Sequence, residues 1–114
     1  MFKRSKYSNK KVVIDGHKFD SKMEAQFYVE NKRWITELQP KIYLTLAKVL
    51  YRPDFKMKWP NRAESYVDVK GAETTMWRLK RRLWKWYGPG EDLEVWKMSR
   101  KQWVLAETVT TEKG

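Results

Sequence analysis

Three charged side chains near the middle of the chain are spaced so that they could hold a metal ion beside an ammonium group. Asp54 lies in one apolar run, and Asp68 and Lys70 occupy alternate positions of a second run. Alternate side chains of a strand share a face, so Asp68 and Lys70 should project together. If the two runs form a hairpin about residues 60–62, Asp54 should lie opposite Asp68 on that same face.

A cation would explain such an arrangement. Like charges placed opposite each other on neighbouring strands destabilise a sheet, and a metal ion between Asp54 and Asp68 would remove the repulsion. Carboxylate oxygens suit Mg²⁺ or Mn²⁺. The Lys70 ammonium could then orient or activate a water molecule, or stabilise charge on a phosphate. Glu24, on the first predicted helix, could add a third carboxylate and help to hold a second metal.

Each of these residues also has a structural explanation. Glu24 stands three residues after Ser21 in an S-x-x-E pattern, which is typical of a helix capping box. Asp54 could pair with a neighbouring cation on the surface. Asp68 and Lys70 could form a solvated strand face, but Asp is a poor strand former between two valines, so its position favours a functional role.

The elements that must position these residues follow from periodicity and turn residues. Asp15-Gly16 predicts a tight hairpin, and Pro40 should end a first helix over residues 21–38, with Met23, Phe27 and Trp34 on its apolar stripe. Strands are expected over 42–49, 51–58, 65–70 and 93–97, a helix over 75–87, and a strand or packed tail within 98–114. The pattern predicts one α/β domain over residues 1–114, with a mixed β-sheet flanked by two helices.

The second predicted helix carries cations and no acid. We expect its basic side chains to contact DNA phosphates and Met76, Leu79, Leu83, Trp86 and Tyr87 to face the core. Trp77 and Trp84 fall on the flank, where packing or dimerisation is favoured over stacking on bases. The residues predicted to bind DNA are Arg78, Lys80, Arg81, Arg82 and Lys85 on this helix, and Lys10 and Lys11 near the N-terminus.

The amino-acid composition limits the kinds of binding partner and of site that the protein can have. The chain has 114 residues, 25 Lys and Arg against 14 Asp and Glu, and a net charge of +11, which favours a polyanionic partner. It contains no cysteine, which excludes disulfides, zinc–thiolate sites and cysteine nucleophiles. Its single histidine, His17, argues against a His-based metal site and Ser-His-Asp catalysis. No apolar run could span a bilayer, so a cytoplasmic protein is expected. Residues 1–11 are basic and predict either a flexible arm that binds DNA or a terminus without a role.

The ordered motifs resemble a known family. Arg52-Pro53-Asp54-Phe55, followed by Tyr66-Val67-Asp68-Val69-Lys70-Gly71, resembles the PD-(D/E)xK nuclease superfamily. The helix start at 19–25 and the segment 38–41 look like its phage and prophage branch, which is related to Holliday junction resolvases. The likeness extends from about residue 10 to about residue 96. Asp68 stands where Glu is commoner, and the superfamily pattern admits either acid.

The resemblance implies a fold, an activity and a set of roles. The fold would be restriction-endonuclease-like. Asp54, Asp68 and the Val69 carbonyl would bind Mg²⁺ or Mn²⁺, Lys70 would position the water, and Glu24 would be an accessory ligand. The protein would hydrolyse phosphodiesters in branched DNA such as Holliday junctions, as a homodimer, in the cytoplasm of a bacterial host if phage-encoded. A DNA-binding protein that keeps the nuclease fold without catalysis is the alternative. A membrane-surface or ribosome-associated role would leave the acids unexplained.

Overall fold

The computed structural model describes residues 11–112. The chain divides into two compact units, and the boundary between them in the sequence lies between Lys32 and Arg33. Lys10 and most of the predicted N-terminal arm lie outside the described residues. No helix within residues 11–112 is both long and apolar enough to cross a membrane.

The N-terminal unit is a hairpin followed by a helix: β1 (Val12–Ile14), β2 (His17–Phe19) and α1 (Lys22–Asn31). The predicted turn is confirmed, since Asp15 and Gly16 have φ angles of 53° and 78° between the antiparallel strands. Ser21 caps α1 as expected, and its side chain accepts a hydrogen bond from the backbone N–H of Glu24. The Tyr28 hydroxyl donates to Asp15 Oδ2 at 2.8 Å and ties the helix to the turn.

The predicted length of the first helix is wrong. It ends at Asn31, and a 3₁₀ turn (Lys32–Trp34) leads into strand β3 (Ile35–Leu38). The Asn31 side chain donates to the Phe27 carbonyl at 3.1 Å, and such side-chain bonds compete with the continuation of a helix. The next residues include the β-branched pair at 35–36, which suits a strand and finds a partner in β6.

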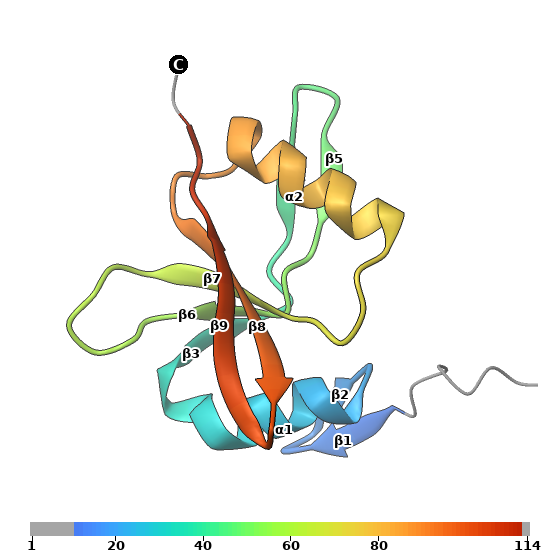
Figure 1. Ribbon diagram of the computed structural model, residues 1–114, viewed down its shortest axis with the longest axis vertical. Coiled ribbons are helices and arrows are strands. Elements are labelled where there is room, and N and C mark those ends of the chain that lie inside the picture. Colours follow the sequence, from blue (N-terminus) through green and yellow to red (C-terminus); the bar gives the residue numbers. More distant parts are fainter. Residues whose placement is uncertain (1–10, 113–114) are drawn as a thin grey trace, which may run out of the picture. The chain divides into compact units, whose positions relative to one another are not determined.

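The C-terminal unit is built on a five-stranded mixed sheet (Figure 1). Its strand order is β3, β6 (Phe55–Met57), β7 (Ser65–Val69), β8 (Asp92–Ser99), β9 (Gln102–Val109). β7 and β8 run parallel and are joined through α2 (Thr75–Tyr87), whereas the other pairs are antiparallel. The expected α/β class with a mixed sheet and two helices is therefore confirmed, and residues 102–109 form a strand.

The two strands predicted over 42–49 and 51–58 are wrong in their limits. The structure has a short hairpin, β4 (Ile42–Leu44) and β5 (Val49–Tyr51), and the chain then leaves the strand before β6. Thr45 and Lys48 adopt φ angles of 76° and 57°, which turn the chain within the first predicted strand. Pro53 interrupts the second, because proline lacks the N–H group that a strand ladder requires.

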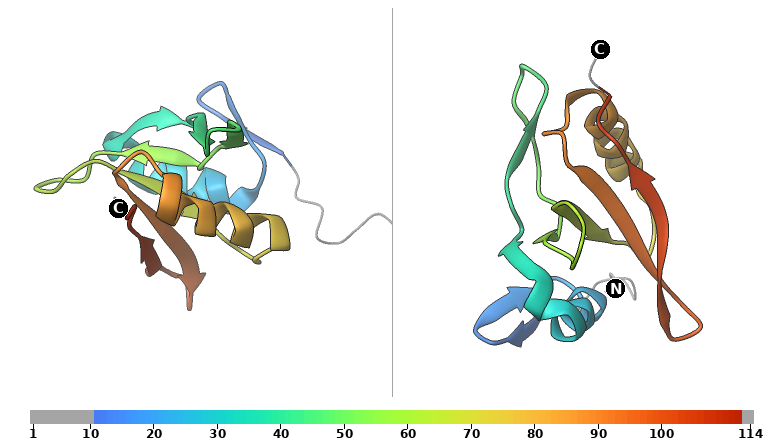
Figure 2. Two further views of the ribbon diagram at one scale, coloured as in Figure 1. Left: turned by 90° about the horizontal axis from the view of Figure 1, so that it is seen from above. Right: turned by 90° about the vertical axis from the view of Figure 1, so that its left-hand side faces the viewer.

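Helix α2 spans the predicted residues but presents a different face to the core. Trp77 and Trp84 are buried, whereas Met76, Leu79, Trp86 and Tyr87 are exposed. Trp84 packs edge-on against Tyr51 and Tyr66, with ring centroids 6.0 and 5.2 Å away. Figure 2 shows α2 beside the β4–β5 hairpin, whose buried residues Leu44 and Tyr51 belong to the same hydrophobic cluster as the two tryptophans. The prediction of the core face was therefore wrong.

Candidate active site

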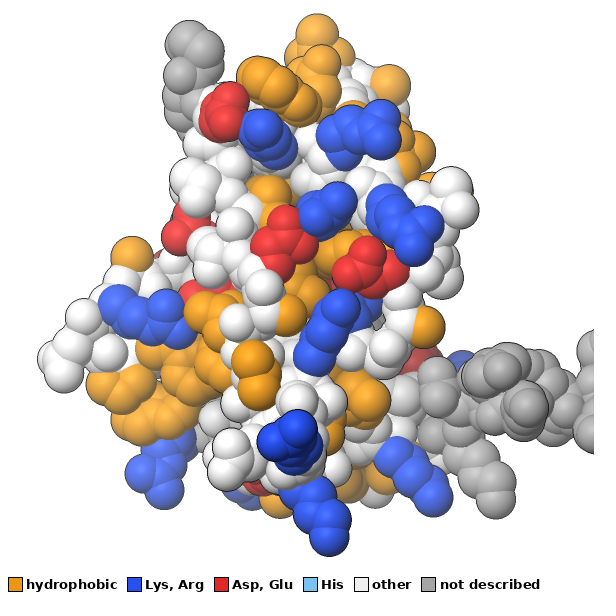
Figure 3. Space-filling view, in the orientation of Figure 1, with side chains coloured by type: hydrophobic (Ala, Val, Ile, Leu, Met, Phe, Trp, Pro, Cys, Tyr) orange, Lys and Arg blue, Asp and Glu red, His pale blue; other side chains and the backbone are white. Residues whose placement is uncertain are grey.

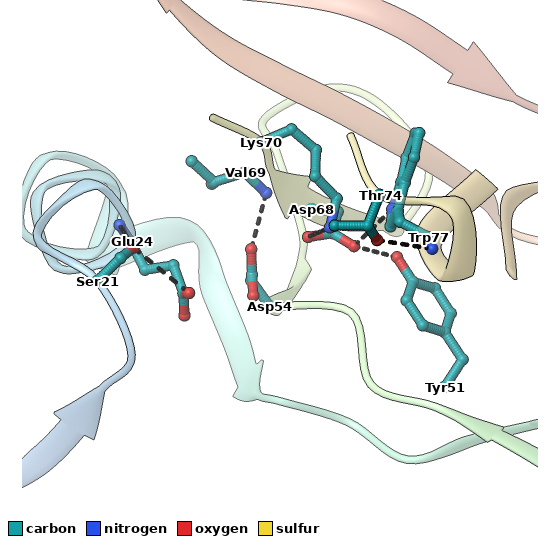
Figure 4. A network of polar contacts seen from close by, with 9 residues as sticks. All are labelled: Ser21, Glu24, Tyr51, Asp54, Asp68, Val69, Lys70, Thr74 and Trp77. Atoms are coloured by element: carbon teal, nitrogen blue, oxygen red, sulfur yellow. Dashed lines mark hydrogen bonds and ion pairs between the residues drawn. The ribbon is translucent and has the colours of Figure 1, made fainter. Parts of the chain in front are cut away.

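The structure brings Asp54 and Asp68 together at one end of the β6–β7 pair. Phe55 lies opposite Val67 in the antiparallel register, so one step outward along both strands leads to Asp54 and Asp68. Asp54 Oδ2 accepts a hydrogen bond of 2.7 Å from the backbone N–H of Val69. This bond fastens the loop before β6 to the end of β7, and Figure 4 shows the two carboxylates beside each other.

Asp68 is a buried carboxylate with several donors around it. Its exposed fraction is 3%, and a carboxylate withdrawn from water to this degree is stable only when it is hydrogen-bonded or paired. Oδ2 accepts hydrogen bonds from the Tyr51 hydroxyl and, at 3.1 Å, from Nε1 of Trp77 (Figure 4). These two donors orient the carboxylate, and Oδ1 is the oxygen that meets Lys70.

Burial raises the pKa of Tyr51 well above its usual range, and the negative charge of Asp68 raises it further. The hydroxyl therefore keeps its proton at neutral pH and remains a donor. Because β5 ends at Tyr51 and α2 supplies Trp77, two elements outside the five-stranded sheet control the orientation of Asp68.

Lys70 completes the site from the end of β7. Its Nζ lies 3.4 Å from Asp68 Oδ1 and 4.9 Å from the centre of the Trp77 ring. Its backbone N–H donates to the Trp96 carbonyl at 3.0 Å, so the residue is anchored to β8. The side chain is largely shielded from solvent, so the Asp68–Lys70 pair is less screened than a surface pair.

Tyr51 and Trp77 were missed as site residues in the sequence analysis. The sequence predicted one uninterrupted strand over 51–58, in which the side chains of Tyr51 and Asp54 would point to opposite faces. The helical projection of residues 75–87 put Trp77 on a flank of the helix. Pro53 was the available signal, since a strand that breaks between Tyr51 and Asp54 no longer keeps those two side chains on opposite faces. No comparable local signal identified Trp77, because the rotation of a helix about its axis is set by what it packs against.

Glu24 belongs to the N-terminal unit and has a local partner there. The Ser21 hydroxyl lies 3.4 Å from Glu24 Oε1 and accepts from the Glu24 backbone N–H at 3.1 Å (Figure 4). Within residues 11–112, no group of three or more His, Cys, Asp or Glu side chains is arranged to hold a metal ion. In the C-terminal unit the site therefore consists of two carboxylates, Lys70 and the backbone of Val69.

The basic side chains of α2 are largely matched by the protein's own acids. Arg78 lies 3.5 Å from Glu73, Arg81 lies 2.8 Å from Glu107, and Lys85 lies 3.5 Å from Glu112. Figure 3 shows acidic and basic side chains alternating over α2, β8 and β9. The lack of acids within the helix therefore does not leave these three cations unmatched, and their contact with DNA stays a prediction.

The remaining predicted DNA contacts differ in their surroundings. Lys80 Nζ donates to the Leu50 carbonyl at 2.7 Å, and Lys11 lies 3.9 Å from Asp20 at the surface of the N-terminal unit. Arg82 is exposed, and together with Arg81, Lys85 and Glu107 it lines a shallow pocket. Arg82 is therefore the α2 cation best placed to contact a phosphate, because within residues 11–112 it would not first have to break an ion pair of the kind that Arg78, Arg81 and Lys85 make.

The hydrogen bond from Tyr51 leads to a stability prediction. Tyr51→Phe removes one donor from a buried carboxylate, and bonds to charged groups contribute about 1.5–3 kcal/mol. We expect the free energy of unfolding in urea to fall by about that amount. Tyr43→Phe is the matched control, because the Tyr43 side chain is exposed and should tolerate the loss of its hydroxyl. Equal stability of the two variants would contradict the bond to Asp68.

Comparison with known proteins identifies a family without a described activity. No curated protein and no solved structure matches the chain. A family model described as "Protein of unknown function (DUF1064)" matches residues 4–106, a range that includes the site residues Asp54, Asp68 and Lys70 as well as Glu24. The match covers most of the chain, and the protein belongs to this DUF1064 family.

Proposed function

We propose that the protein is a divalent-metal-dependent endodeoxyribonuclease with a restriction-endonuclease-like fold of the PD-(D/E)xK type. The observation that carries the proposal is the position of Asp54 next to the buried Asp68 at one end of the β6–β7 pair, with Asp68 Oδ1 3.4 Å from the Lys70 ammonium. The two acids and the lysine lie together at one end of a strand pair, close to the start of α2. A strand face exposed to solvent would not require this arrangement.

The donor set fits Mg²⁺ or Mn²⁺. Both ions prefer oxygen ligands, and Mg²⁺ is commonly held by one or two carboxylates together with water and substrate phosphates. Asp54 and Asp68 would supply these carboxylates, and the Val69 carbonyl remains the predicted third protein ligand. The bound ion would stabilise negative charge on the phosphate and lower the pKa of a bound water. Glu24 stays a predicted accessory ligand.

Each residue of the site has a role that follows from its contacts. Tyr51 and Trp77 hold Oδ2 of Asp68, so the carboxylate does not rotate away and Oδ1 stays directed toward Lys70. The Val69 N–H restrains Asp54 in the same way. Lys70 donates toward Asp68 Oδ1 and has three N–H donors in all, so it can also contact a phosphate oxygen or orient the attacking water.

Cleavage can be tested directly. The protein is incubated with linear, nicked, circular and four-way-junction DNA, with Mg²⁺, with Mn²⁺ or with a chelator. We expect cleavage only with the metal ions, with 5′-phosphate and 3′-hydroxyl ends. Four-way junctions are included because the resemblance to resolvases predicts branched DNA as the substrate. Cleavage that persists in the chelator would contradict the metal requirement.

A non-catalytic DNA-binding protein is the second candidate. The net charge of +11 favours binding to DNA whether or not the site cuts it. Binding without cleavage on every substrate and with either metal would support this candidate and reject the nuclease. A calorimetric titration that detects no Mn²⁺ binding would weigh against the metal site in particular.

The contribution of α2 to DNA binding leads to a further prediction. Each phosphate contact contributes about −0.9 to the slope of log affinity against log salt concentration. Replacing Arg78, Arg81 and Arg82 together with Ala should therefore flatten the slope measured by fluorescence anisotropy, by about one for each cation that contacts a phosphate. The control variant replaces Lys41, Lys48 and Lys101, which removes the same charge from other surface positions. A similar slope for the two variants would reject a specific role for α2.

A further inference from the structure

The outward face of α2 combines exposed aromatic rings with cations. Trp86 and Tyr87 are 55% and 53% exposed, and Trp86 projects almost opposite to the buried Trp84 because a helix turns by about 100° per residue. Arg82 lies one turn before Trp86, and side chains at this spacing are neighbours on a helix. Lys85 Nζ lies 5.5 Å from the centre of the Trp86 ring. Figure 3 shows hydrophobic and basic side chains next to one another over this helix.

The charge on this face favours an anionic ligand over an apolar one. Three of the α2 cations, Arg78, Arg81 and Lys85, are matched by glutamates. The other two, Lys80 and Arg82, lie on opposite sides of the outward apolar residues. Within residues 11–112, Lys80 donates to a backbone carbonyl and Arg82 makes no ion pair. An apolar partner would withdraw both charges from water without a counter-charge, whereas a polyanion would supply one.

We propose that this face of α2 binds the unpaired bases of single-stranded DNA. A base would stack on the Trp86 ring while a phosphate of the same strand contacts Arg82. Intact duplex DNA offers phosphates on its outside but keeps the faces of its bases stacked within, so it would use the cations and leave the ring in water. An unpaired base has a free face, and stacking on an aromatic side chain strengthens binding by about ten-fold or more for each base.

The stacking face is separate from the carboxylate site, although one helix contributes to both. Trp77 donates to Asp68 from the first turn of α2, and Trp86 follows nine residues later, about 14 Å along the helix. A strand bound at Trp86 would therefore leave Asp68 free to act on a neighbouring part of the same DNA. The proposal rests on the DNA binding that both candidate functions share, and it does not require cleavage.

The experiment compares two single strands that carry the same phosphates, oligo(dT) and an abasic strand of equal length. Binding to the whole protein is measured by fluorescence anisotropy in a chelator, so that no DNA is cut. We expect the wild type to bind oligo(dT) about ten-fold more tightly than the abasic strand, and Trp86→Ala to remove that difference. The salt dependence for oligo(dT) should stay the same in Trp86→Ala, whereas Arg82→Ala should flatten its slope by about 0.7. Equal binding of both strands by the wild type, or an unchanged preference in Trp86→Ala, would overturn the proposal.

Three further variants separate stacking from other effects of the substitution. Tyr43→Ala removes a ring that is 56% exposed outside α2, and it should leave the preference for oligo(dT) unchanged. Trp86→Phe keeps a ring face and should retain most of the preference, whereas Trp86→Leu keeps only apolar surface and should behave like Trp86→Ala. A Trp86→Leu protein with the wild-type preference would reject stacking.

The outcome can also be told apart from a failure of the proposed nuclease. A protein that shows the Trp86-dependent preference but cuts no DNA with either metal ion rejects the nuclease alone. A protein that cuts DNA, but whose Trp86→Ala variant prefers oligo(dT) as the wild type does, rejects the stacking face alone. A wild type that binds neither single strand rejects the stacking face whatever its activity on duplex or junction DNA.

Discussion

Replacing Asp68 with Asn is expected to abolish metal-dependent DNA cleavage and to leave the fold and DNA binding intact. The asparagine carbonyl oxygen can still accept the hydrogen bonds that Tyr51 and Trp77 donate to Oδ2 of the wild-type acid. Its amide would then occupy the position of Oδ1, where it presents N–H donors to Lys70 instead of a charged acceptor. The substitution thus removes the charge that would hold the metal while it keeps the shape of the site.

The expected loss of cleavage rate is on the order of 10²–10³-fold or more, since the removal of one electrostatic contact to the transition state already has an effect of that size. Cleavage of the preferred DNA substrate is measured under single-turnover conditions, and Mn²⁺ affinity is measured by calorimetry. DNA binding in the chelator provides a readout that the substitution should not change.

Asp92→Asn is the matched control for this prediction. Asp92 is the first residue of β8 and lies opposite Ser65 in the parallel register, three residues before Val95, which lies opposite Asp68. The substitution therefore makes the same chemical change in the same sheet, away from the proposed site. We expect this variant to cut DNA at the wild-type rate. A fully active Asp68→Asn protein would reject the proposed site, and equal losses in both variants would indicate a general effect of charge on the sheet.

Replacing Trp84 with Ala is expected to destabilise the protein more than any other substitution in α2. Trp84 has an exposed fraction of 0% and lies edge-on to Tyr51 and Tyr66. Its indole N–H also donates to the Glu91 carbonyl at 3.2 Å. Loss of a buried tryptophan leaves a cavity and removes about 3–5 kcal/mol of stability, which is a large share of the total of about 5–15 kcal/mol expected for a domain.

The prediction is tested by urea unfolding, with Trp86→Ala as the matched control on the same helix. Trp86 is 55% exposed, and at a concentration where the protein is monomeric its removal should change stability by less than about 0.5 kcal/mol. The helical projection of the sequence alone predicts the opposite order, with Trp86 in the core and Trp84 on the flank. If Trp86→Ala proves the more destabilising variant, the observed rotation of α2 is wrong.

Local features of the fold could be predicted from the sequence where one or two residues decide the conformation. Asp15 and Gly16 tolerate the positive φ angles of a tight turn, and Ser21 satisfies an orphan N–H group at the start of α1. The limits predicted for α2, residues 75–87, are also those of the structure, where the Thr74 side chain accepts a hydrogen bond from the Trp77 N–H and Gly88 follows the last helical residue. The neighbouring positions of Asp54 and Asp68 follow from a hairpin whose turn is visible in the sequence.

Features that depend on a distant partner could not be predicted in this way. The segment at 35–38 continues an apolar helical pattern, yet it becomes a strand because the edge of β6 offers hydrogen bonds to it. The sequence of α2 contains no acid, but Arg81 and Lys85 pair with Glu107 and Glu112, which come from a part of the chain more than twenty residues away. Neither outcome is encoded in the residues adjacent to it.

The sequence alone determined that this is a basic α/β protein with a mixed sheet and an acid–acid–lysine set that a hairpin can bring together. Only the tertiary structure decided how Asp68 is held, because Tyr51 and Trp77 reach it from a separate hairpin and from a helix whose rotation is set by packing. The physical reason is that the periodicity of apolar residues and the preferences of turn residues depend on only a few neighbouring positions. The burial of a particular helix face and the donors to a buried charge depend instead on side chains brought together by folding.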